Sequence, residues 1–313
     1  MKTIDAAQVD ALLDYPALLD ALEAGHRAGI DEAERLLLEQ RSPGGSANHF
    51  LIWPAWRHGE ALGIKLVTSF PDNASAGLPT VQAVYVLFEG THGSPSALID
   101  GTAMTPWKTA ADSALGARFL ARADARSLLM VGAGVMAPHL IRAHLTARPS
   151  IRRVTLWNRT RDAAARLTET LALDGVEIAL GKDLETAVRS AEVISCATGA
   201  TAPLIQGAWL QPGTHLDLVG GFTPEMREAD DEACRRARIY VDSRWFTIGC
   251  VGDLTAPMES GAITEDDILG DLFQLSRGEV TGRTGPQDIT LYKNAGGAHL
   301  DLMTARLIAA RAS

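Results

Sequence analysis

From residue 127 onward, strand-like and helix-like segments alternate, and this alternation constrains the fold more than any other feature of the chain. Short apolar runs typical of strands are SLLMVG, RRVTLW, AEVISCA, THLDLVG and ARIYVD, and helical spacing occurs in APHLIRAHLTA and RDAAARLTETLA. Parallel neighbours in a sheet cannot be joined by a hairpin and need a crossover, which a helix provides. The pattern therefore predicts an α/β fold with a doubly wound parallel sheet.

The residues before position 127 show a different organisation. Apolar residues from Leu12 to Leu22 recur with helical spacing, and we expect this helix to continue toward Leu38 with interruptions. Strand-like runs follow at 49–56, 61–70, 80–90 and 94–100, separated by Gly, Pro, Asn and Asp. They predict an antiparallel sheet with a helix packed on it. Helical spacing returns at 109–123, which is expected to link two domains, and the helix within 289–312 is expected to fold back onto the first domain.

A glycine-rich turn separates the first strand and the first helix of the alternating region. Its sequence is Gly132-Ala133-Gly134-Val135-Met136-Ala137, a G-x-G-x-x-A pattern. The first glycine permits the tight turn, the second lets a pyrophosphate approach the backbone, and the small third residue lets helix and strand pack closely. The N-terminus of the helix then faces the phosphates. Because a strand precedes the turn and a helix and second strand follow it, we interpret it as a dinucleotide site.

The end of the second strand indicates which dinucleotide is preferred. An acid at this position would accept hydrogen bonds from both ribose hydroxyls and would repel a 2′-phosphate. This chain has Asn158, Arg159 and Thr160 instead, which bring an uncharged amide, a cation and a hydroxyl donor. The combination favours NADPH, with NAD as the alternative cofactor. The competing interpretation is that Arg159 and Arg161 are only solvated residues at the start of a helix.

Composition and charge argue against several other classes of protein. The 313 residues are 46% apolar and 21% charged, an ordinary globular composition with enough residues for two domains. A net charge of −9 provides no cationic excess for binding nucleic acid. The three cysteines form no CxxC pair, so no disulfide framework and no metal site are predicted. Neither a signal peptide nor a membrane span is recognised, and we expect a cytoplasmic protein.

Five motifs occur along the chain in a recognisable order: LGIKLVTSFPDN (62–73), GLPTVQA (77–83), TPWKTAADSALGARFLA (105–121), VGAGVMA (131–137) and GGAHLDL (296–302). In these motifs and their spacing the chain resembles the ornithine cyclodeaminase and mu-crystallin family. The resemblance implies a homodimer whose subunit has two domains. Residues 1–112 with 292–313 are expected to form a discontinuous α+β domain for substrate binding and dimerisation, and residues 113–291 a Rossmann domain that binds NAD(P).

The resemblance also implies roles for individual residues. Arg41 and Lys65 match positions that grip the substrate carboxylate. Lys108 stands where most members have arginine, and it can balance an anion but lacks the planar bidentate fork. His299, in a Gly-rich turn before the last helix, is a candidate proton donor, although a lone histidine is more often structural. The expected cofactor-binding residues are Thr80, Thr109, Gly132, Gly134, Val135, Met136, Asn158, Arg159, Thr160, Thr198, Gly220, Phe222 and Asn294.

Two departures distinguish the chain from the cyclodeaminases of this family. Those enzymes have an Asp soon after a Gly in the loop that follows THLDLVG, where this chain has Gly220-Gly221-Phe222, and they have a Glu near Leu51. Cyclodeamination needs a base and an anchor for the distal ammonium of ornithine, whereas reduction of a cyclic ketimine needs a carboxylate clamp, a hydride donor and one proton. GGFTPEMRE (220–228) and NAGGAHLD (294–301) also resemble the pyrroline- and piperideine-carboxylate reductases.

We therefore predict an NADPH-dependent reductase that converts 1-pyrroline-2-carboxylate or 1-piperideine-2-carboxylate to proline or pipecolate. Two alternatives stay open. An ornithine cyclodeaminase or alanine dehydrogenase activity fits the family more broadly, and a non-catalytic NADPH-dependent ligand-binding protein is known in the mu-crystallin branch. Lys65 and Arg41 argue against the latter, because a storage protein has no need of them.

Two further interpretations concern charged residues. Lys65 lies inside the apolar strand IKLV, where an unpaired ammonium is costly, so we expect it to be paired or functional. Arg41 is expected in a loop, before SPGGSA. The acids of EADDE, residues 228–232, are interpreted as the solvated start of a helix.

Overall fold

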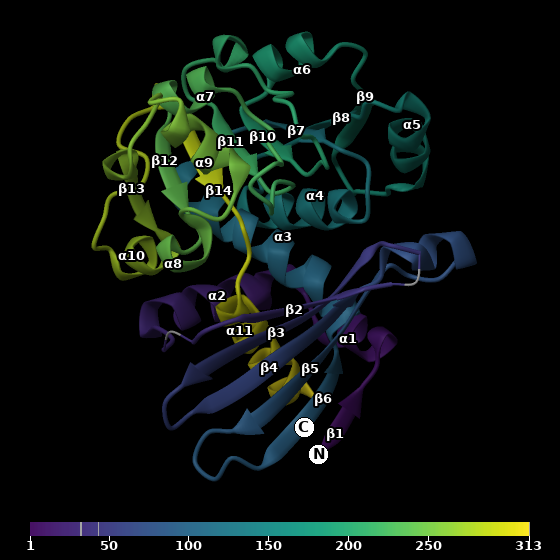
Figure 1. The fold of residues 1–313 in the computed structure, drawn as a ribbon. Helices are drawn as coiled ribbons and strands as arrows, with labels where there is room; N and C mark the ends of the chain where they lie inside the picture. Colours follow the sequence, from purple (N-terminus) through teal and green to yellow (C-terminus); the bar gives the residue numbers. More distant parts are fainter. Residues whose placement is uncertain (32, 43, 313) are drawn as a thin grey trace. The chain divides into compact units, whose positions relative to one another are not determined.

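The computed structural model describes residues 1–31, 33–42 and 44–312, which form two compact units (Figure 1). The first unit consists of Met1–Thr109 and Gly297–Ser313, and the second of Ala110–Gly296. These limits differ from the domain limits expected from the sequence by three residues at the first junction (109 against 112) and five at the second (297 against 292). The second difference has a clear cause, because residues 290–293 form a strand inside the sheet of the second unit.

The first unit is built on a six-stranded sheet with the order β1-β6-β5-β4-β3-β2. Neighbours are antiparallel except β1, which pairs in parallel with β6. The antiparallel sheet predicted from the sequence is therefore correct apart from this short edge strand. The strands are β1 (Lys2–Ile4), β2 (Leu36–Arg41), β3 (Ala47–Arg57), β4 (Ala61–Ser69), β5 (Val81–Glu89) and β6 (Pro95–Asp100), and a 3-10 turn, η1 (Pro71–Ala76), follows β4.

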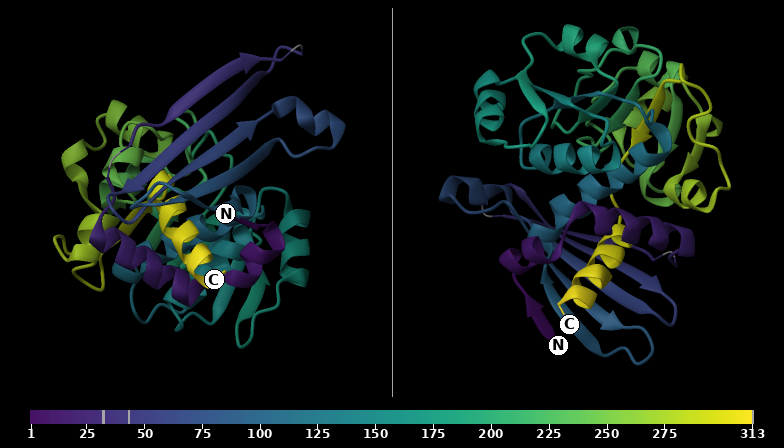
Figure 2. Two further views of the ribbon diagram at one scale, coloured as in Figure 1. Left: turned by 90° about the horizontal axis from the view of Figure 1, so that it is seen from below. Right: turned by 180° about the vertical axis from the view of Figure 1, so that it is seen from behind.

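Three helices of this unit are α1 (Ala6–Leu12), α2 (Tyr15–Ala28) and α11 (Ala298–Arg311), and α2 and α11 lie on the same face of the sheet (Figure 2). Helix α2 begins where the Asp14 side chain accepts a hydrogen bond from the Ala17 N–H, and it ends at Gly29, whose φ of 86° suits glycine. The expected continuation of this helix toward Leu38 is wrong. Leu36–Arg41 instead pairs with β3 as an edge strand, with Leu36 opposite Ile52.

The second unit contains an eight-stranded sheet in which every pairing is parallel, with the order β13-β12-β14-β11-β10-β7-β8-β9. The predicted doubly wound parallel sheet is confirmed. From β7 the chain proceeds outward to β8 and β9, and then returns to the other side of β7 for β10 and β11. The strand order thus reverses between β7 and β10, which is where α/β proteins of this kind bind ligands, beyond the carboxyl ends of the strands.

The elements of the second unit have the following bounds. The strands are β7 (Ser127–Val131), β8 (Arg153–Trp157), β9 (Glu177–Leu180), β10 (Val193–Cys196), β11 (His215–Leu218), β12 (Arg238–Val241), β13 (Ile268–Asp271) and β14 (Thr290–Lys293). The helices are α4 (Met136–Ala147), α5 (Arg161–Thr170), α6 (Leu184–Ser190), α7 (Asp231–Arg236), α8 (Arg244–Thr247), α9 (Gly252–Glu259) and α10 (Leu272–Arg277), with 3-10 turns η2 (Gly207–Trp209) and η3 (Glu265–Asp267). Helix α3 (Gly101–Leu120) contributes residues to both units.

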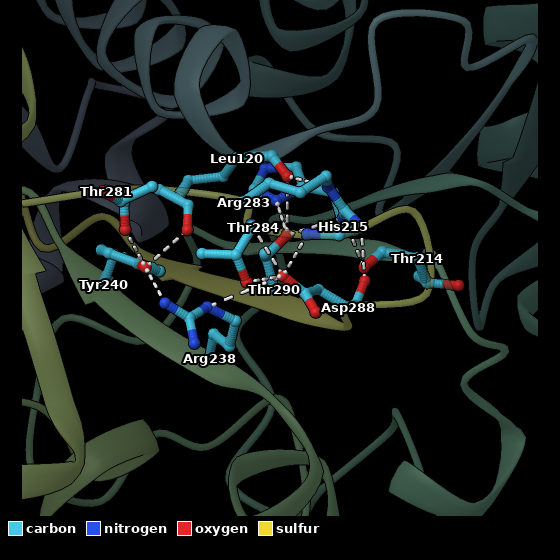
Figure 3. A network of polar contacts seen from close by, with 12 residues as sticks. Leu120, Thr214, His215, Arg238, Tyr240, Thr281, Arg283, Thr284, Asp288 and Thr290 are labelled. Carbon is cyan, nitrogen blue, oxygen red and sulfur yellow. Dashed lines mark hydrogen bonds and ion pairs between the residues drawn. The ribbon is translucent and has the colours of Figure 1, made fainter.

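A polar network fixes the amino ends of β11, β12 and β14 (Figure 3). Arg283, in the loop before β14, donates to the Leu120 carbonyl at the end of α3 over 2.7 Å, and to the Thr290 hydroxyl over 3.1 Å. Tyr240 of β12 contacts the carbonyls of Thr281 and Gly282 in the same loop. This network closes the end of the sheet opposite to the carboxyl ends, and it holds the return segment that leads into β14. Of the helices formed by the described residues, none has the length and hydropathy needed to span a bilayer.

Candidate active site

The first unit contains two lysines that share one buried carboxylate. Lys65 Nζ of β4 lies 3.2 Å from Asp301 Oδ1 of α11, and Lys108 Nζ of α3 lies 3.1 Å from Asp301 Oδ2. Lys65 also donates to the Thr105 hydroxyl over 2.6 Å, and Lys108 to the Gly297 carbonyl over 3.2 Å. The three charged side chains are at most 5% exposed. We call Lys65, Lys108 and Asp301 the lysine cluster.

The lysine cluster is held in place by three separate elements. Lys65 occupies the sheet face that packs against α11, because the alternate residues Ala61 and Gly63 of β4 are buried there with it. Burial, with a smaller effect from the neighbouring Lys108, lowers the pKa of Lys65 to about 8, and Asp301 opposes this change. Tyr85, directly across the sheet from Lys65, is also buried, and this burial raises its pKa well above the usual value. Lys65 is therefore paired, as expected for a lysine in an apolar strand.

The other substrate-site residues expected in this unit have different surroundings. Arg41 is exposed at the end of β2, rather than in a loop. Thr80 is exposed just before β5, and Thr109 follows Lys108 in α3. His299 is 1% exposed and lies edge-on to His26, with ring centroids 5.3 Å apart. Burial lowers the pKa of His299 well below its usual value, so the imidazole is neutral at pH 7 and its assignment as a proton donor stays a prediction.

In the second unit, the expected nucleotide residues follow the carboxyl ends of neighbouring strands. Gly132 follows β7 and Asn158 follows β8, while Thr198, Gly220 and Asn294 come within two residues of the ends of β10, β11 and β14. Gly132 has a φ of 110°, and a Cβ there would lie 2.4 Å from the Ala197 carbonyl oxygen, so only glycine fits. A Cβ at Gly134 would meet nothing within 4 Å. Val135, the N-cap of α4, makes no side-chain capping bond, which leaves this helix start available to a phosphate.

The turn after β8 also has a geometry that suits an anion. The Asn158 side chain donates to the Thr160 carbonyl over 2.8 Å and so shapes the turn. Arg159 and Thr160 are exposed, and Thr160 is the N-cap of α5 without a side-chain capping bond. Residues 158–160 include no carboxylate, and Asp162 follows in the first turn of α5. The preference for a nucleotide with a phosphate near the ribose, and the assignment of Arg159 to that phosphate, stay predictions.

Glu228 joins two of these loops, and its position contradicts the interpretation of residues 228–232 as a solvated helix start. It is fully buried. Its Oε1 accepts hydrogen bonds from the Thr198 amide over 2.7 Å and from the Thr198 hydroxyl over 2.8 Å. Its Oε2 accepts from the amides of Val219 at 3.1 Å and Gly220 at 2.8 Å. We call this arrangement the Glu228 clasp, and it ties the loop after β10 to the loop after β11.

A buried ion pair, Asp253 with Lys293, adjoins the Glu228 clasp. Asp253 accepts from the Glu228 amide over 2.7 Å and from Lys293 Nζ over 2.9 Å, and the side chains of Asp253 and Lys293 are fully buried. Burial raises the pKa of Glu228 to about 7, against the opposing effect of Lys293. Because Glu228 accepts from donors on both oxygens, its ionised form matches the clasp best.

The clasp and Asp253 explain why glycines occupy positions 220 and 221, just before Phe222. A Cβ at Gly220 would lie 2.0 Å from the Thr198 carbonyl oxygen, and a Cβ at Gly221 would lie 2.5 Å from Asp253 Oδ2. Phe222, next in the loop, is 69% exposed, and Leu51 is half-buried in β3. Carboxylates from other segments do approach this loop, but Glu228 and Asp253 are engaged by backbone amides and Lys293. Asn294 is buried and donates to the Ser113 hydroxyl over 2.9 Å.

Sequence reasoning missed Asp301, Glu228, Asp253 and Lys293. A signal existed for Asp301, because a lysine in an apolar strand requires a counter-charge and Asp301 is the acid within the apolar stretch HLDLM. No comparable signal existed for Glu228, which is one of four acids in EADDE. Within the residues that the structure describes, no group of three or more His, Cys, Asp or Glu side chains has the arrangement of a metal site.

Comparison with known proteins assigns the chain to a family. Residues 5–313 match the ornithine cyclodeaminase/mu-crystallin family. The chain belongs to this family. It is 44% identical to a Delta(1)-pyrroline-2-carboxylate reductase of Paracoccus denitrificans over 95% of this chain and 92% of the relative.

Two solved structures of similar fold extend the comparison. A Thermococcus litoralis Delta(1)-pyrroline-2-carboxylate reductase in complex with NADH and L-proline has a TM-score of 0.90, with 28% identity over 100% of this chain and 97% of that chain. An archaeal alanine dehydrogenase dimer with bound NAD has a TM-score of 0.91, with 25% identity over 100% of this chain and 96% of that chain. The resemblance to the family inferred from the sequence motifs is thus confirmed over almost the whole length.

Proposed function

We propose that this member of the family is an NADPH-dependent reductase of cyclic ketimine carboxylates, which converts 1-pyrroline-2-carboxylate or 1-piperideine-2-carboxylate to proline or pipecolate. The observation that carries the proposal is the 44% identity, over 95% of the chain, to a Delta(1)-pyrroline-2-carboxylate reductase. The lysine cluster supports it, because the substrate has one carboxylate and the cluster has an excess of cationic donors. The uncharged Leu51 and Phe222 support it as well, since neither anchors the distal ammonium of ornithine.

The cofactor and the cationic residues have separate roles in the proposed imine reduction. When bound, the nicotinamide supplies the hydride. Lys65 and Lys108 hold the carboxylate through charge-assisted hydrogen bonds, and we assign Arg41 to the same carboxylate. The ring nitrogen of a ketimine is basic and takes up a proton. The protonated imine accepts hydride more easily, which reduces the need for a dedicated protein acid.

The cofactor assignment rests on the loops of the second unit. Gly132 and the uncapped start of α4 are proposed to receive the pyrophosphate, with Gly134, Val135 and Met136 alongside. Asn158, Arg159 and Thr160 are proposed to receive the ribose phosphate, which favours NADPH over NADH. Thr80, Thr109, Thr198, Gly220, Phe222 and Asn294 complete the proposed cofactor contacts.

We further propose a cytoplasmic homodimer, and the exposed face of the six-stranded sheet supports the dimer. This outer face, opposite to α2 and α11, consists of Leu36, Leu38, Phe50, Ile52, Trp56, Leu62, Ile64, Leu66, Val84 and Val86. Leu36 is 50% exposed, Trp56 48% and Val84 42%. An apolar sheet face of this extent is normally covered by another protein surface. The similar archaeal alanine dehydrogenase is a dimer.

The assay that tests the proposed reaction compares three substrates. Purified protein is expected to oxidise NADPH with 1-pyrroline-2-carboxylate, to release no ammonia from ornithine with NAD or NADP, and to give little NADH from L-alanine and NAD. Release of ammonia and proline from ornithine, without NADPH oxidation by the imine, would overturn the proposal in favour of a cyclodeaminase. Binding of NADPH without turnover of any of the three would favour a ligand-binding protein.

A further inference from the structure

The buried acids of the second unit are concentrated in one half of its sheet. Glu228 holds the loops after β10 and β11, and Asp253 holds the Glu228 amide. Asp242 follows β12 and accepts hydrogen bonds from the amides of Ala295 and Gly296, in the loop after β14, over 2.9 and 2.7 Å. In the described part of this unit, the buried acids are Asp112, Asp217, Glu228, Asp242, Asp253 and Asp271, and none of them lies between β7 and β9.

Cations do not balance these carboxylates. Among the described lysines and arginines of this unit, only Lys293 is buried, and it pairs with Asp253 over 2.9 Å. Glu228, Asp253 and Lys293 are 0%, 1% and 0% exposed. We call these three residues the Glu228 group. With two carboxylates and one ammonium, the group has a net charge of −1 when all its members are ionised.

The side chains around the Glu228 group do not change this count. Burial raises the pKa of the Cys196 thiol, on β10, well above its usual value, so this thiol is neutral. Cys234 of α7 contacts the Asp253 carbonyl, and burial raises the pKa of its thiol to about 12, so it is neutral as well. Arg227, next to Glu228 in the chain, pairs with Asp231. The group therefore keeps an excess of one carboxylate.

The strand order indicates which half of a dinucleotide lies near the Glu228 group. In a doubly wound sheet, the two halves of the dinucleotide lie on opposite sides of the point where the strand order reverses. The turns after β7 and β8 are assigned to the pyrophosphate and the adenosine ribose. The loops after β10 and β11, which Glu228 joins, are then left for the nicotinamide half. The nicotinamide ring is uncharged in NADPH and carries a positive charge in NADP+.

We propose that the Glu228 group stabilises the positive charge of the oxidised nicotinamide ring, and so strengthens the binding of NADP+ relative to that of NADPH. This inference rests on the proposed function and gives the buried carboxylates a role beyond the ordering of loops. A buried negative charge attracts a cation through a medium of low dielectric constant, without direct contact. Because positive charge develops on the ring as the hydride leaves it for the imine carbon, the same attraction lowers the barrier to hydride transfer.

The first experiment measures the affinity of both cofactors for the full-length protein, by calorimetric titration at pH 8.5 without substrate. Glu228→Gln removes the excess charge and is expected to raise the ratio of the Kd of NADP+ to the Kd of NADPH at least fivefold. Asp288→Asn makes the same change of charge just before β14, at the amino end of the sheet. This control should leave the ratio within twofold of the wild-type value.

The ratio separates the charge of Glu228 from its effect on loop geometry. Disordered loops weaken both cofactors by a similar factor, because NADP+ and NADPH differ only at the nicotinamide ring. An unchanged ratio in Glu228→Gln would therefore refute the inference and leave the proposed function intact. Wild-type protein that binds neither cofactor would instead refute the proposed function.

The second experiment uses the wild type and so does not depend on the folding of a variant. Burial raises the pKa of Glu228 to about 7, and a cation bound nearby lowers it again. The preference for NADP+ should thus decrease as the pH falls through about 7 and Glu228 takes up a proton.

At pH 7, binding of NADP+ is expected to release a larger fraction of a proton than binding of NADPH. The release is measured from the dependence of the binding enthalpy on the ionisation enthalpy of the buffer. The 2′-phosphate titrates in both cofactors and cancels in this comparison. Equal proton release by the two cofactors would contradict the proposed effect of the Glu228 group.

Discussion

Lys65 is the residue on which the proposed reaction depends most directly. Lys65→Met removes one charge-assisted contact to the substrate carboxylate, worth roughly 1.5 to 3 kcal/mol, so kcat/KM for the imine is expected to fall about 10- to 150-fold. The folded-state pKa of Lys65 is about 8, below its usual value, so the ammonium is present at low pH and is lost as the pH rises through about 8. Wild-type kcat/KM should decline over the same range.

The control for this residue is Lys65→Arg, which keeps the cation at high pH. It should retain more activity than Lys65→Met and show no decline near pH 8. If Lys65→Met retains full catalytic efficiency while thermal unfolding shows an intact fold, Lys65 does not bind the carboxylate.

Arg159 is the residue that we propose decides the preference between NADPH and NADH. It is exposed after β8 in a turn without a carboxylate, where a cation favours a 2′-phosphate. Arg159→Ala is expected to weaken NADPH binding about tenfold and leave NADH binding nearly unchanged, as measured by equilibrium fluorescence titration. Arg166→Ala, an exposed arginine further along α5, is the matched control for loss of charge. Tighter binding of NADH than of NADPH by the wild type would show that the assignment of this turn is wrong.

At the scale of elements, we expect the carboxyl end of the second sheet to affect cofactor binding and its amino end to affect stability. At the carboxyl end, Glu228→Gln replaces an acceptor oxygen of the Glu228 clasp with an NH2 group that faces backbone or hydroxyl donors. Each buried donor left without an acceptor costs about 1 to 3 kcal/mol. Because the clasp orders loops assigned to the cofactor, the KM for NADPH should rise about tenfold or more, with a smaller change in kcat.

The pH dependence of the clasp follows from the pKa of Glu228, which burial raises from 4.5 to about 7. The ionised form fits the clasp, so NADPH affinity of the wild type should decrease as the pH falls below about 7. The folded protein retains this proton over a range in which the unfolded chain has lost it, so the free energy of unfolding should decrease as the pH rises from about 4.5 to about 7. Glu228→Gln lacks both dependences. A variant that binds NADPH like the wild type, with unchanged pH dependence, would exclude a role for the clasp.

At the amino end of the same sheet, Arg283→Ala is the control for Glu228→Gln. Arg283 is partly buried and hydrogen-bonds Leu120 and Thr290, far from the carboxyl ends of the strands. Loss of these bonds should lower the melting temperature, because buried carbonyl and hydroxyl groups lose their donor. The KM for NADPH should stay within about twofold of the wild-type value. An increase in KM as large as that of Glu228→Gln would show that the two ends are not independent.

At the scale of the whole molecule, the outer face of the six-stranded sheet predicts self-association. Ile64→Lys places a charge in the middle of this face, between Pro54 of β3 and Val86 of β5, and is expected to convert a dimer into a monomer because these neighbours offer no partner for the charge. Leu269→Lys, at an exposed apolar residue in the second unit, is the control and should leave the dimer intact. Light scattering after gel filtration measures the mass. A wild-type monomer, or equal effects of the two substitutions, would refute the assignment of this face.

The sequence alone was sufficient for the features that depend on local order along the chain. The alternation of apolar strands and helices from residue 127 determined the parallel sheet, because each crossover needs a helix of its own. The glycine turn after β7 was predicted from its G-x-G-x-x-A pattern between a strand and a helix, and the φ of 110° at Gly132, with one close backbone contact, explains why only glycine fits there. Lys65 was recognised as paired or functional because its apolar neighbours in the strand already implied burial.

Only the tertiary structure decided which distant groups meet. Leu36–Arg41 has the apolar residues of a helix as much as of a strand, and it becomes β2 because β3 offers a free edge for hydrogen bonding. Asp301 lies 236 residues from Lys65, and Glu228 is 30 residues from Thr198, so neither pair leaves a periodicity in the sequence. Glu228 looked like a solvated acid because charge patterns do not reveal which carboxylate folds inward. Its burial is stabilised by amides of two loops and by Lys293, and those partners come together only when the parallel strands align their carboxyl ends.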